Sequence, residues 1–265
     1  MRKGWILLSL WLALPVAAQT SVPLLPADEI IRRFLDRCQT TTNRLAAQCH
    51  ACVRRTVIEE LGGDGVVKER KTREHAVELR GESPAVKLLK LDGRAPTERE
   101  AKRETTKEAE LKQRYAERKD KARERGPDFV DEKLVRRFAY VNEGTETVGG
   151  RPAHVLRFQA GPNAPAKDAS ERALNLLAGR IWIDAEEFEL VKVEARLKEP
   201  LAVLGGIVAS IQRLDFSIER RRQPDGFWFN TVLGTYAEGR KLFSTFRIRS
   251  RIEQDEFRPL PAAQP

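Results

Sequence analysis

Apolar and charged residues alternate along much of the C-terminal half of the chain. Between residues 191 and 198, four apolar side chains alternate with four charged ones, and the same period recurs in residues 214–219 and 246–252. A period of two is that of a β-strand with one apolar and one polar face. Together with shorter apolar stretches, this pattern predicts strands at residues 133–141, 153–158, 179–184, 188–198, 214–219, 227–236 and 246–252.

Turn-forming residues separate several of these strands. Gly149-Gly150 and Pro224-Asp225-Gly226 are expected to form hairpin turns, and Glu238-Gly239-Arg240 is expected to form another. Strands joined by such short turns pair with their neighbours in sequence, so we expect an antiparallel meander.

The N-terminal half begins with a helical pattern. Apolar residues recur at helical spacing after Asp28, a residue that can cap a helix, which predicts an amphipathic helix over residues 27–45. From Cys49 the pattern becomes that of a strand, and the glycine-rich segment Gly62–Gly65 predicts a hairpin turn. The second arm of this hairpin is expected at residues 66–79, and a third short strand at 86–91.

Three segments differ from this pattern. Residues 97–126 contain eleven Lys or Arg and eight Asp or Glu, which favours a solvated helical insertion; an arm that binds a membrane surface or a partner is the alternative. Residues 201–211 form an apolar run, interrupted by Gly205-Gly206, that is typical of a strand start or a short core helix. The alternative interpretation of that run is a mobile apolar flap over a pocket, since paired glycines permit hinging. The proline-rich tail, residues 258–265, is expected to be disordered.

Composition adds a compartment to this picture. The chain has 265 residues, 41% of them apolar, and a net charge of +9, which excludes a fibrous, fully disordered or polytopic membrane protein. Residues 1–18 resemble a signal peptide, because two cations precede a twelve-residue apolar stretch and Val16-Ala17-Ala18 offers small residues for cleavage. We therefore expect a soluble periplasmic protein of net charge +7, whose basic surface meets anionic lipid headgroups or acidic envelope partners and no nucleic acid.

The segment Cys49-His50-Ala51-Cys52 is the most suggestive local motif for thiol or metal chemistry. A haem-attachment motif needs a histidine at position 53, which is Val. In a strand, residues three apart point to opposite faces, so we expect a disulfide between Cys38 and either Cys49 or Cys52 rather than within the motif. A zinc site would have unusual spacing, and no metal is expected. The chain contains no catalytic signature, so neither an enzyme nor a cofactor is expected.

Several segments resemble the LolA-like family of periplasmic outer-membrane lipoprotein-sorting proteins. They are residues 27–35 (ADEIIRRFL), 149–156 (GGRPAHVL), 179–184 (GRIWID), 188–197 (FELVKVEARL) and 224–228 (PDGFW). The resemblance implies a mainly β fold with helices (α+β): a single domain over residues 19–257 that forms a curved, incomplete antiparallel β-barrel. In this family helices cover the concave apolar face, and the cavity between them holds acyl chains.

These observations lead to one main hypothesis and two alternatives. The main hypothesis is a carrier of a lipid or acylated lipoprotein. The alternatives are an envelope sensor or scaffold that binds a protein partner, and a thiol-redox protein that uses Cys49 and Cys52. The strand alternation predicts that the apolar cavity is lined by Leu156, Phe158, Val191, Val193, Phe216, Phe229, Phe246 and Ile248.

Overall fold

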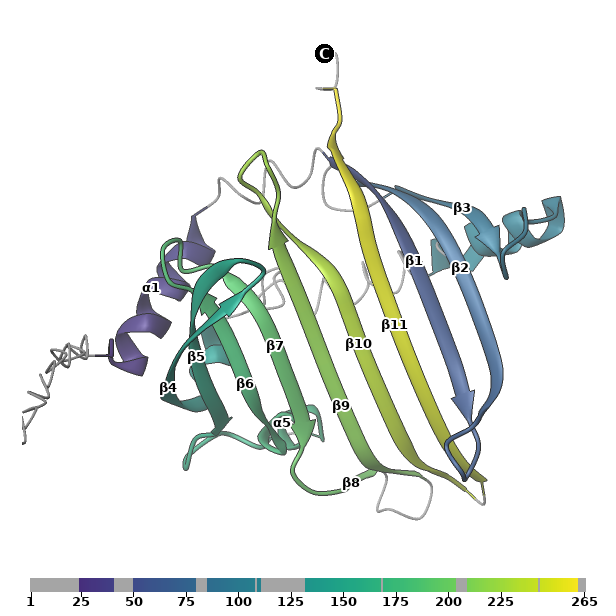
Figure 1. Ribbon diagram of the computed structural model, residues 1–265. Coiled ribbons are helices and arrows are strands. Elements are labelled where there is room, and N and C mark those ends of the chain that lie inside the picture. Colours follow the sequence, from purple (N-terminus) through teal and green to yellow (C-terminus); the bar gives the residue numbers. More distant parts are fainter. Residues whose placement is uncertain are drawn as a thin grey trace, which may run out of the picture.

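One antiparallel sheet forms most of the protein (Figure 1). The structure is a computed structural model that describes residues 24–40, 50–79, 85–107, 109–110, 132–167, 169–203, 209–242 and 244–261. Within these residues the strands are β1 (His50–Leu61), β2 (Val67–Leu79), β3 (Ala85–Leu91), β4 (Phe138–Val148), β5 (Arg151–Ala160), β6 (Leu177–Asp184), β7 (Leu190–Leu197), β8 (Leu201–Val203), β9 (Ala209–Arg222), β10 (Trp228–Lys241) and β11 (Ser244–Pro259). The helices are α1 (Ala27–Gln39), α4 (Glu132–Val135) and α5 (Ala169–Asn175), and residues 98–107 are also helical.

The sheet consists of two meanders joined through the last strand. The strand order is β3-β2-β1-β11-β10-β9-β7-β6-β5-β4, and β8 pairs with β9 alone. Residues of β1 pair with residues of β11 from His50 with Pro259 to Glu60 with Ile248. Because β3 and β4 are the two edges and do not pair with each other, the sheet stays open. The expected mainly β, antiparallel architecture is thus confirmed as a single open sheet, which is consistent with an incomplete barrel.

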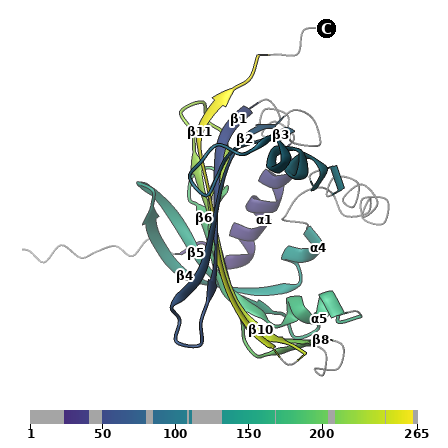
Figure 2. The ribbon, with the colours of Figure 1, turned by 90° about the vertical axis from the view of Figure 1, so that its right-hand side faces the viewer.

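Helix α1 packs on one face of the sheet. Its buried residues Ile30, Phe34 and Leu35 share one side of the helix, since Phe34 is four positions after Ile30 and Leu35 follows Phe34. This apolar stripe packs with Leu156 of β5 and Ile181 of β6 in the main apolar cluster. Figure 2 shows α1, α4 and α5 on the same side of the sheet. This side is called the helix face below. The helix ends at Gln39, since Thr40 is extended, and is therefore shorter than expected.

Two local predictions were wrong. Residues 132–135 form helix α4 instead of the start of a strand, because Arg136 pairs with Glu132 one turn away and Val135 is buried in the main cluster. Gly239 lies inside β10 instead of in a turn, since Glu238 pairs with Arg247 across the ladder. Strand β11 ends at Pro259 and therefore includes the first two residues of the expected tail, Arg258 and Pro259.

The other turn predictions are confirmed. Gly149 and Gly150 have φ of 58° and 83° between β4 and β5, and Gly226 has φ of 92° between β9 and β10. The segment Gly62–Gly65 joins β1 to β2. Glycine suits these positions because it adopts positive φ without a steric penalty.

Candidate functional site

A continuous row of apolar residues crosses the helix face from β5 to β11. Each member is the direct cross-strand partner of the next, so all side chains in the row point to the same face. We call it the apolar row; it consists of Leu156, Ile181, Val193, Ile218, Leu233 and Ile252.

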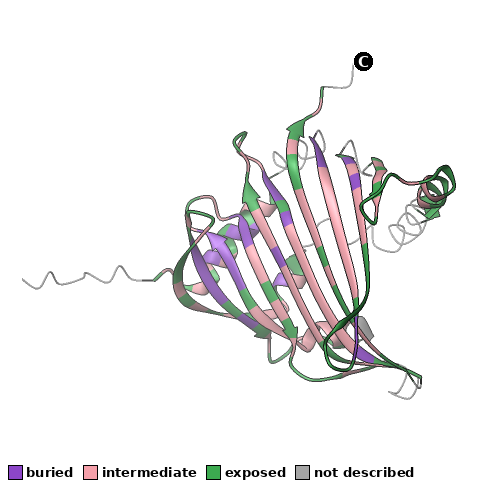
Figure 3. Ribbon diagram, turned by 45° about the vertical axis from the view of Figure 1, so that its right-hand side comes forward, coloured by how far each residue is buried: buried purple, intermediate pink, exposed green. Residues whose placement is uncertain are grey.

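The apolar row has a covered part and a more open part. Leu156 and Ile181 are buried in the cluster that includes α1, whereas Leu233 and Ile252 are half-buried. Figure 3 shows the same change, with buried residues concentrated toward β5 and β6 and intermediate ones along β10 and β11. Further along β11 on the same face, Ile248 is 40% exposed. The helix face therefore carries apolar surface beyond the area that α1 covers.

Six of the eight predicted cavity residues lie on the helix face. Leu156 and Val193 belong to the apolar row. The neighbouring row contains Phe158 and Phe216, since Phe158 pairs with Gly179, Gly179 with Ala195, and Ala195 with Phe216. Strand alternation along β11 places Phe246 and Ile248 on the same face as Ile252.

The other two predicted residues lie elsewhere. Val191 packs in a second cluster with Trp182 and Trp228, because a bulge opposite Trp182 and Ile183 removes it from the regular alternation. Phe229 is buried near the end of the sheet, where its ring stacks on Phe257 at a centroid distance of 4.5 Å. Neither residue lies beside the apolar row in the way that the sequence pattern predicted.

A cavity of about 700 Å³ lies between α1, α4 and β4. Its apolar lining comes from Ile31, Leu35, Val135, Phe138 and Tyr140, of which Leu35 and Val135 belong to the main cluster. Charged residues of α1 and α4 also line it. The cavity has the size of a small-molecule site and adjoins the covered end of the apolar row.

A second hollow crosses the opposite face of the sheet. Arg157 lies between Leu156 and Phe158 in β5, and Arg180 precedes Ile181 in β6, so both point away from α1. We call this hollow the outer trough; it has a volume of about 710 Å³ and its charged lining consists of Arg157, Arg180, Glu194, Arg196, Asp215, Arg249 and Arg251. No ion-pair partner of Arg196 is present among the described residues.

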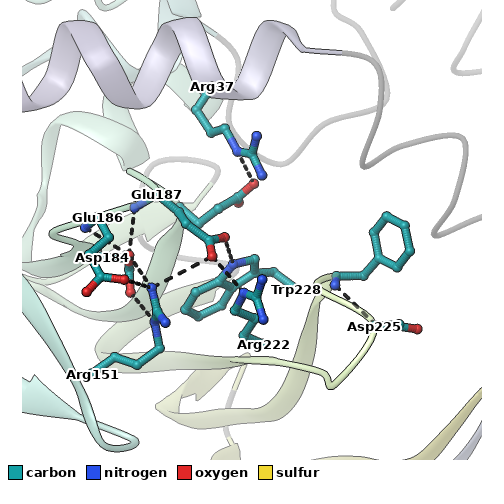
Figure 4. A network of polar contacts seen from close by, with 10 residues as sticks. Arg37, Arg151, Asp184, Glu186, Glu187, Arg222, Asp225 and Trp228 are labelled. Atoms are coloured by element: carbon teal, nitrogen blue, oxygen red, sulfur yellow. Dashed lines mark hydrogen bonds and ion pairs between the residues drawn. The ribbon is translucent and has the colours of Figure 1, made fainter.

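A polar network joins α1 to the turn between β6 and β7 (Figure 4). Arg37 of α1 donates to Glu189 at 2.9 Å, and Arg220 of β9 donates to the other oxygen of the same carboxylate at 3.1 Å. Glu187 accepts hydrogen bonds from Arg222 at 2.6 Å and from the Trp228 indole at 2.8 Å. These bonds hold the end of α1 near the rim of the sheet.

Asp184 is the most buried charge of this network, with no exposed surface. Arg151 donates two hydrogen bonds to it, at 2.7 and 3.0 Å, and the backbone N–H groups of Glu186 and Glu187 donate two more. Burial acts to raise the pKa of Asp184, but these hydrogen bonds outweigh it and hold the pKa below its usual value. The carboxylate is fully engaged, so it stabilises the turn and is unsuited to acid-base catalysis.

The described cysteines give no support to redox chemistry. Cys52 is buried in β1, and burial raises the pKa of its thiol, which disfavours the reactive thiolate. Cys38 packs against the main cluster, whereas Cys49 lies outside the described residues, so the disulfide stays a prediction. Within the described part of the chain, no three His, Cys, Asp or Glu residues are grouped as a metal site would require.

His50 has a structural role that the sequence pattern does not indicate. Its Nε2 lies 2.9 Å from Asp225 in the turn between β9 and β10, and its ring contacts that of Phe229 at a centroid distance of 4.9 Å. His50 therefore links the first strand to a distant turn. The neighbouring cysteines directed attention to metal chemistry, and no local signal indicated this long-range contact.

Comparison with protein-family models gives no match, and comparison with curated proteins gives none either. Solved structures do match. A putative outer membrane lipoprotein-sorting protein domain from Vibrio parahaemolyticus is 10% identical, with 89% of this chain and 93% of that chain covered and a TM-score of 0.33. A LolA superfamily protein from Nitrosomonas europaea is 10% identical, with coverages of 91% and 96% and a TM-score of 0.30.

The complex structure of Pseudomonas aeruginosa MucA/MucB also matches, at 12% identity, coverages of 89% and 100%, and a TM-score of 0.23. The names of the first two structures agree with the LolA-like lipoprotein-sorting family that segments of this sequence resemble. Similarity at this level carries no argument about function, which has to rest on the geometry described above. Among the described residues, no helix has the length and apolar character needed to cross a membrane.

Proposed function

We propose that this protein is a periplasmic carrier that binds an acyl chain of a lipid or lipoprotein on the helix face of its sheet. The observation that carries the proposal is the apolar row, which continues past α1 onto β10 and β11 as half-buried side chains. A contiguous apolar surface of this kind is a common mark of a binding site in a soluble protein. No catalytic role is part of the proposal.

An acyl chain suits this surface physically. Each methylene group that leaves water contributes roughly 0.8 kcal/mol, so even partial burial of a long chain along the row gives useful affinity. A row without charged members offers no hydrogen bonds, which fits an apolar chain better than a polar ligand. The adjoining cavity of about 700 Å³ has a mixed lining, in which Ile31, Leu35 and Phe138 add apolar side chains beside the charged ones.

The test is binding of a fluorescent fatty acid, together with native mass spectrometry of protein purified from an envelope fraction. Ile248→Asp places a charge at the open end of the helix face, at a partly exposed position where a loss of folding is not expected. We expect it to weaken probe binding at least tenfold. Val141→Asp is the matched control, since Val141 is an exposed valine on edge strand β4.

Phe216→Asp probes the middle of the helix face, with thermal unfolding measured in parallel because Phe216 is partly buried. If the wild-type protein carries no lipid and binds no probe, the carrier proposal is wrong. Equal probe binding by wild type, Ile248→Asp and Val141→Asp would place the acyl chain elsewhere and would also contradict it.

The outer trough favours a second candidate function, the binding of an acidic protein partner. Five arginines and two acids line it, and exposed ion pairs such as Arg251 with Glu253 contribute little stability, so a partner carboxylate can replace them. We expect a fluorescent oligoglutamate peptide to bind in a salt-sensitive way and Arg196→Glu to weaken it. Arg172→Glu, at an exposed position on helix α5, is the control. No binding at low salt would contradict this candidate.

A further inference from the structure

Two neighbouring hairpin turns at one end of the sheet present exposed aliphatic side chains. Val66 and Val67, in the β1–β2 hairpin, are 62% and 40% exposed, and Leu242, in the β10–β11 turn, is 54% exposed. These three account for half of the exposed large hydrophobic residues in the described part of the chain. Leu242 also has φ of 54°, a region that favours glycine, so this turn presents a leucine despite the backbone strain.

The two turns lie side by side. Strand β11 begins between the ends of β1 and β10, and Arg247 of β11 donates to the Gly62 carbonyl at 3.4 Å. Figure 1 shows both turns at the lower right of the sheet. We call residues 62–71, 238–242 and 244–247 together the hairpin tip.

The hairpin tip is basic around its aliphatic residues. It contains six Lys or Arg and three Asp or Glu. Lys68 and Lys241 are exposed and make no ion pair among the described residues, whereas Lys71 makes an exposed pair with Glu69 and Arg247 makes a partly buried pair with Glu238. An exposed pair such as Lys71 with Glu69 is weak, so Lys71 can exchange the carboxylate for another anion.

We propose that the hairpin tip docks on the surface of an anionic phospholipid bilayer. The three aliphatic side chains enter the boundary between headgroups and acyl chains, and the surrounding cations contact the phosphates. Aliphatic residues at projecting turns suit a deformable lipid surface, whereas the core of a protein interface is built from fitted, desolvated pockets. This inference concerns where the protein docks and does not depend on its carrying an acyl chain.

The docking site has a geometric relation to the helix face. Phe246 lies within the hairpin tip and Ile248 directly follows it on β11, and both belong to the helix face. A protein docked through the tip would therefore bring the open end of that face toward the bilayer.

The test is co-sedimentation of the purified protein with phosphatidylcholine vesicles that contain phosphatidylglycerol. We expect binding that weakens with added salt and is lost on pure phosphatidylcholine. The double variant Val66→Asp/Leu242→Asp should bind at least tenfold more weakly, and Lys68→Gln/Lys241→Gln should bind more weakly with a smaller salt dependence. Val141→Asp and Lys198→Gln are the matched controls, since Val141 is exposed on edge strand β4, Lys198 is exposed directly after β7, and neither belongs to the hairpin tip; both variants should bind like the wild type. The wild type and all variants have the same N-terminal segment, so any contribution of that segment to vesicle binding is the same in every comparison.

A second measurement reports insertion directly. Trp182 and Trp228 are buried, so a tryptophan introduced by Leu242→Trp gives a distinct environment-sensitive signal. We expect its emission to shift to shorter wavelength on anionic vesicles, with no shift for Val141→Trp. Absence of vesicle binding by the wild type, equal binding by the tip variants and the controls, or no spectral shift for Leu242→Trp would each overturn the proposal. Loss of acyl-chain binding alone would leave it standing, so the two proposals fail independently.

Discussion

At the scale of single residues, close packing between strands sets the strictest requirements. A Cβ added at Gly239 would lie 2.3 Å from the Ser210 carbonyl oxygen and 2.7 Å from the Phe246 ring. Neither neighbour can move freely, because the oxygen belongs to the backbone of β9 and the ring lies directly across the ladder. Glycine is therefore needed here for space, in the middle of a strand.

We expect Gly239→Ala to destabilise the protein by about 1–3 kcal/mol, through overpacking between β9 and β11. Gly63→Ala is the control, since its added Cβ would meet nothing closer than the Arg247 guanidinium at 3.6 Å. Urea unfolding of both variants measures the difference. A Gly239→Ala variant as stable as Gly63→Ala would show that the strands can separate at no cost.

His154 gives a pH prediction. It is 8% exposed, it stacks against Phe188, and neither ring nitrogen has a hydrogen-bond partner within the described structure. Burial lowers its pKa, with Asp184 opposing and Arg33 assisting this change. Because the unfolded state takes up a proton near pH 6.5 while the folded state does so only at lower pH, stability should fall as the pH drops below about 6.5.

His154→Phe keeps an aromatic ring and loses no hydrogen bond, so its unfolding free energy should fall less between pH 7 and 5 than that of the wild type. Some pH dependence should persist, because burial lowers the pKa of His75 as well. Urea midpoints at several pH values provide the measurement. Identical pH profiles for wild type and variant would mean that His154 does not contribute.

Strand alternation alone was enough to assign Leu156, Phe158, Val193, Phe216, Phe246 and Ile248 to one face. It failed at Val191 because a bulge adds one residue to β7 relative to β6, and nothing in the local sequence marks that bulge. It also overstated how far the eight residues form one cavity. Which part of an apolar face becomes covered depends on tertiary packing, and a period of two contains no information about it.

At the scale of elements, α1 is held by an apolar stripe and a charged end. Ile30, Phe34 and Leu35 are buried against the sheet, while Arg37 reaches Glu189 at the rim. The helical period predicted the stripe directly. The strand residues that this stripe contacts could not be predicted, because they lie more than a hundred positions later in the sequence. That separation is about the length of a small domain.

We expect Phe34→Ala to cost about 3 kcal/mol and to raise hydrogen exchange in α1 and in β5 to β7, since it leaves a cavity between helix and sheet. Asp36→Ala is the control, because the Asp36 side chain is exposed and its ion pair with Arg32 stays within the helix. Hydrogen exchange followed by mass spectrometry compares the two. Unchanged exchange in the sheet after Phe34→Ala would show that α1 is not part of the core.

At the scale of the whole molecule, the pairing of β1 with β11 decides whether there is one sheet or two. The paired residues lie up to about two hundred positions apart, so the order of strands could not be read from turns between neighbours. Local patterns correctly predicted most strands and an antiparallel meander. They could not predict that the N-terminal strands β1, β2 and β3 extend the sheet beyond β11.

Removal of β11 should therefore disrupt the molecule far more than its length suggests. A chain truncated after Leu242 lacks every β11 residue that pairs with β1, and it also exposes β10 as an edge from Val232 to Lys241. A long unpaired edge favours aggregation, and β1 to β3 would form only a small separate sheet with little core of its own. We expect this truncation to abolish cooperative unfolding, with Trp182 and Trp228 more exposed to water than in the full chain.

A chain truncated after Pro261 keeps all strand pairs and should unfold like the full protein. Tryptophan fluorescence and far-ultraviolet circular dichroism across a urea series distinguish the two. A cooperative transition in the shorter chain would mean that the strands from β4 to β10 form an independent domain, and that the β1–β11 ladder joins two units instead of completing one.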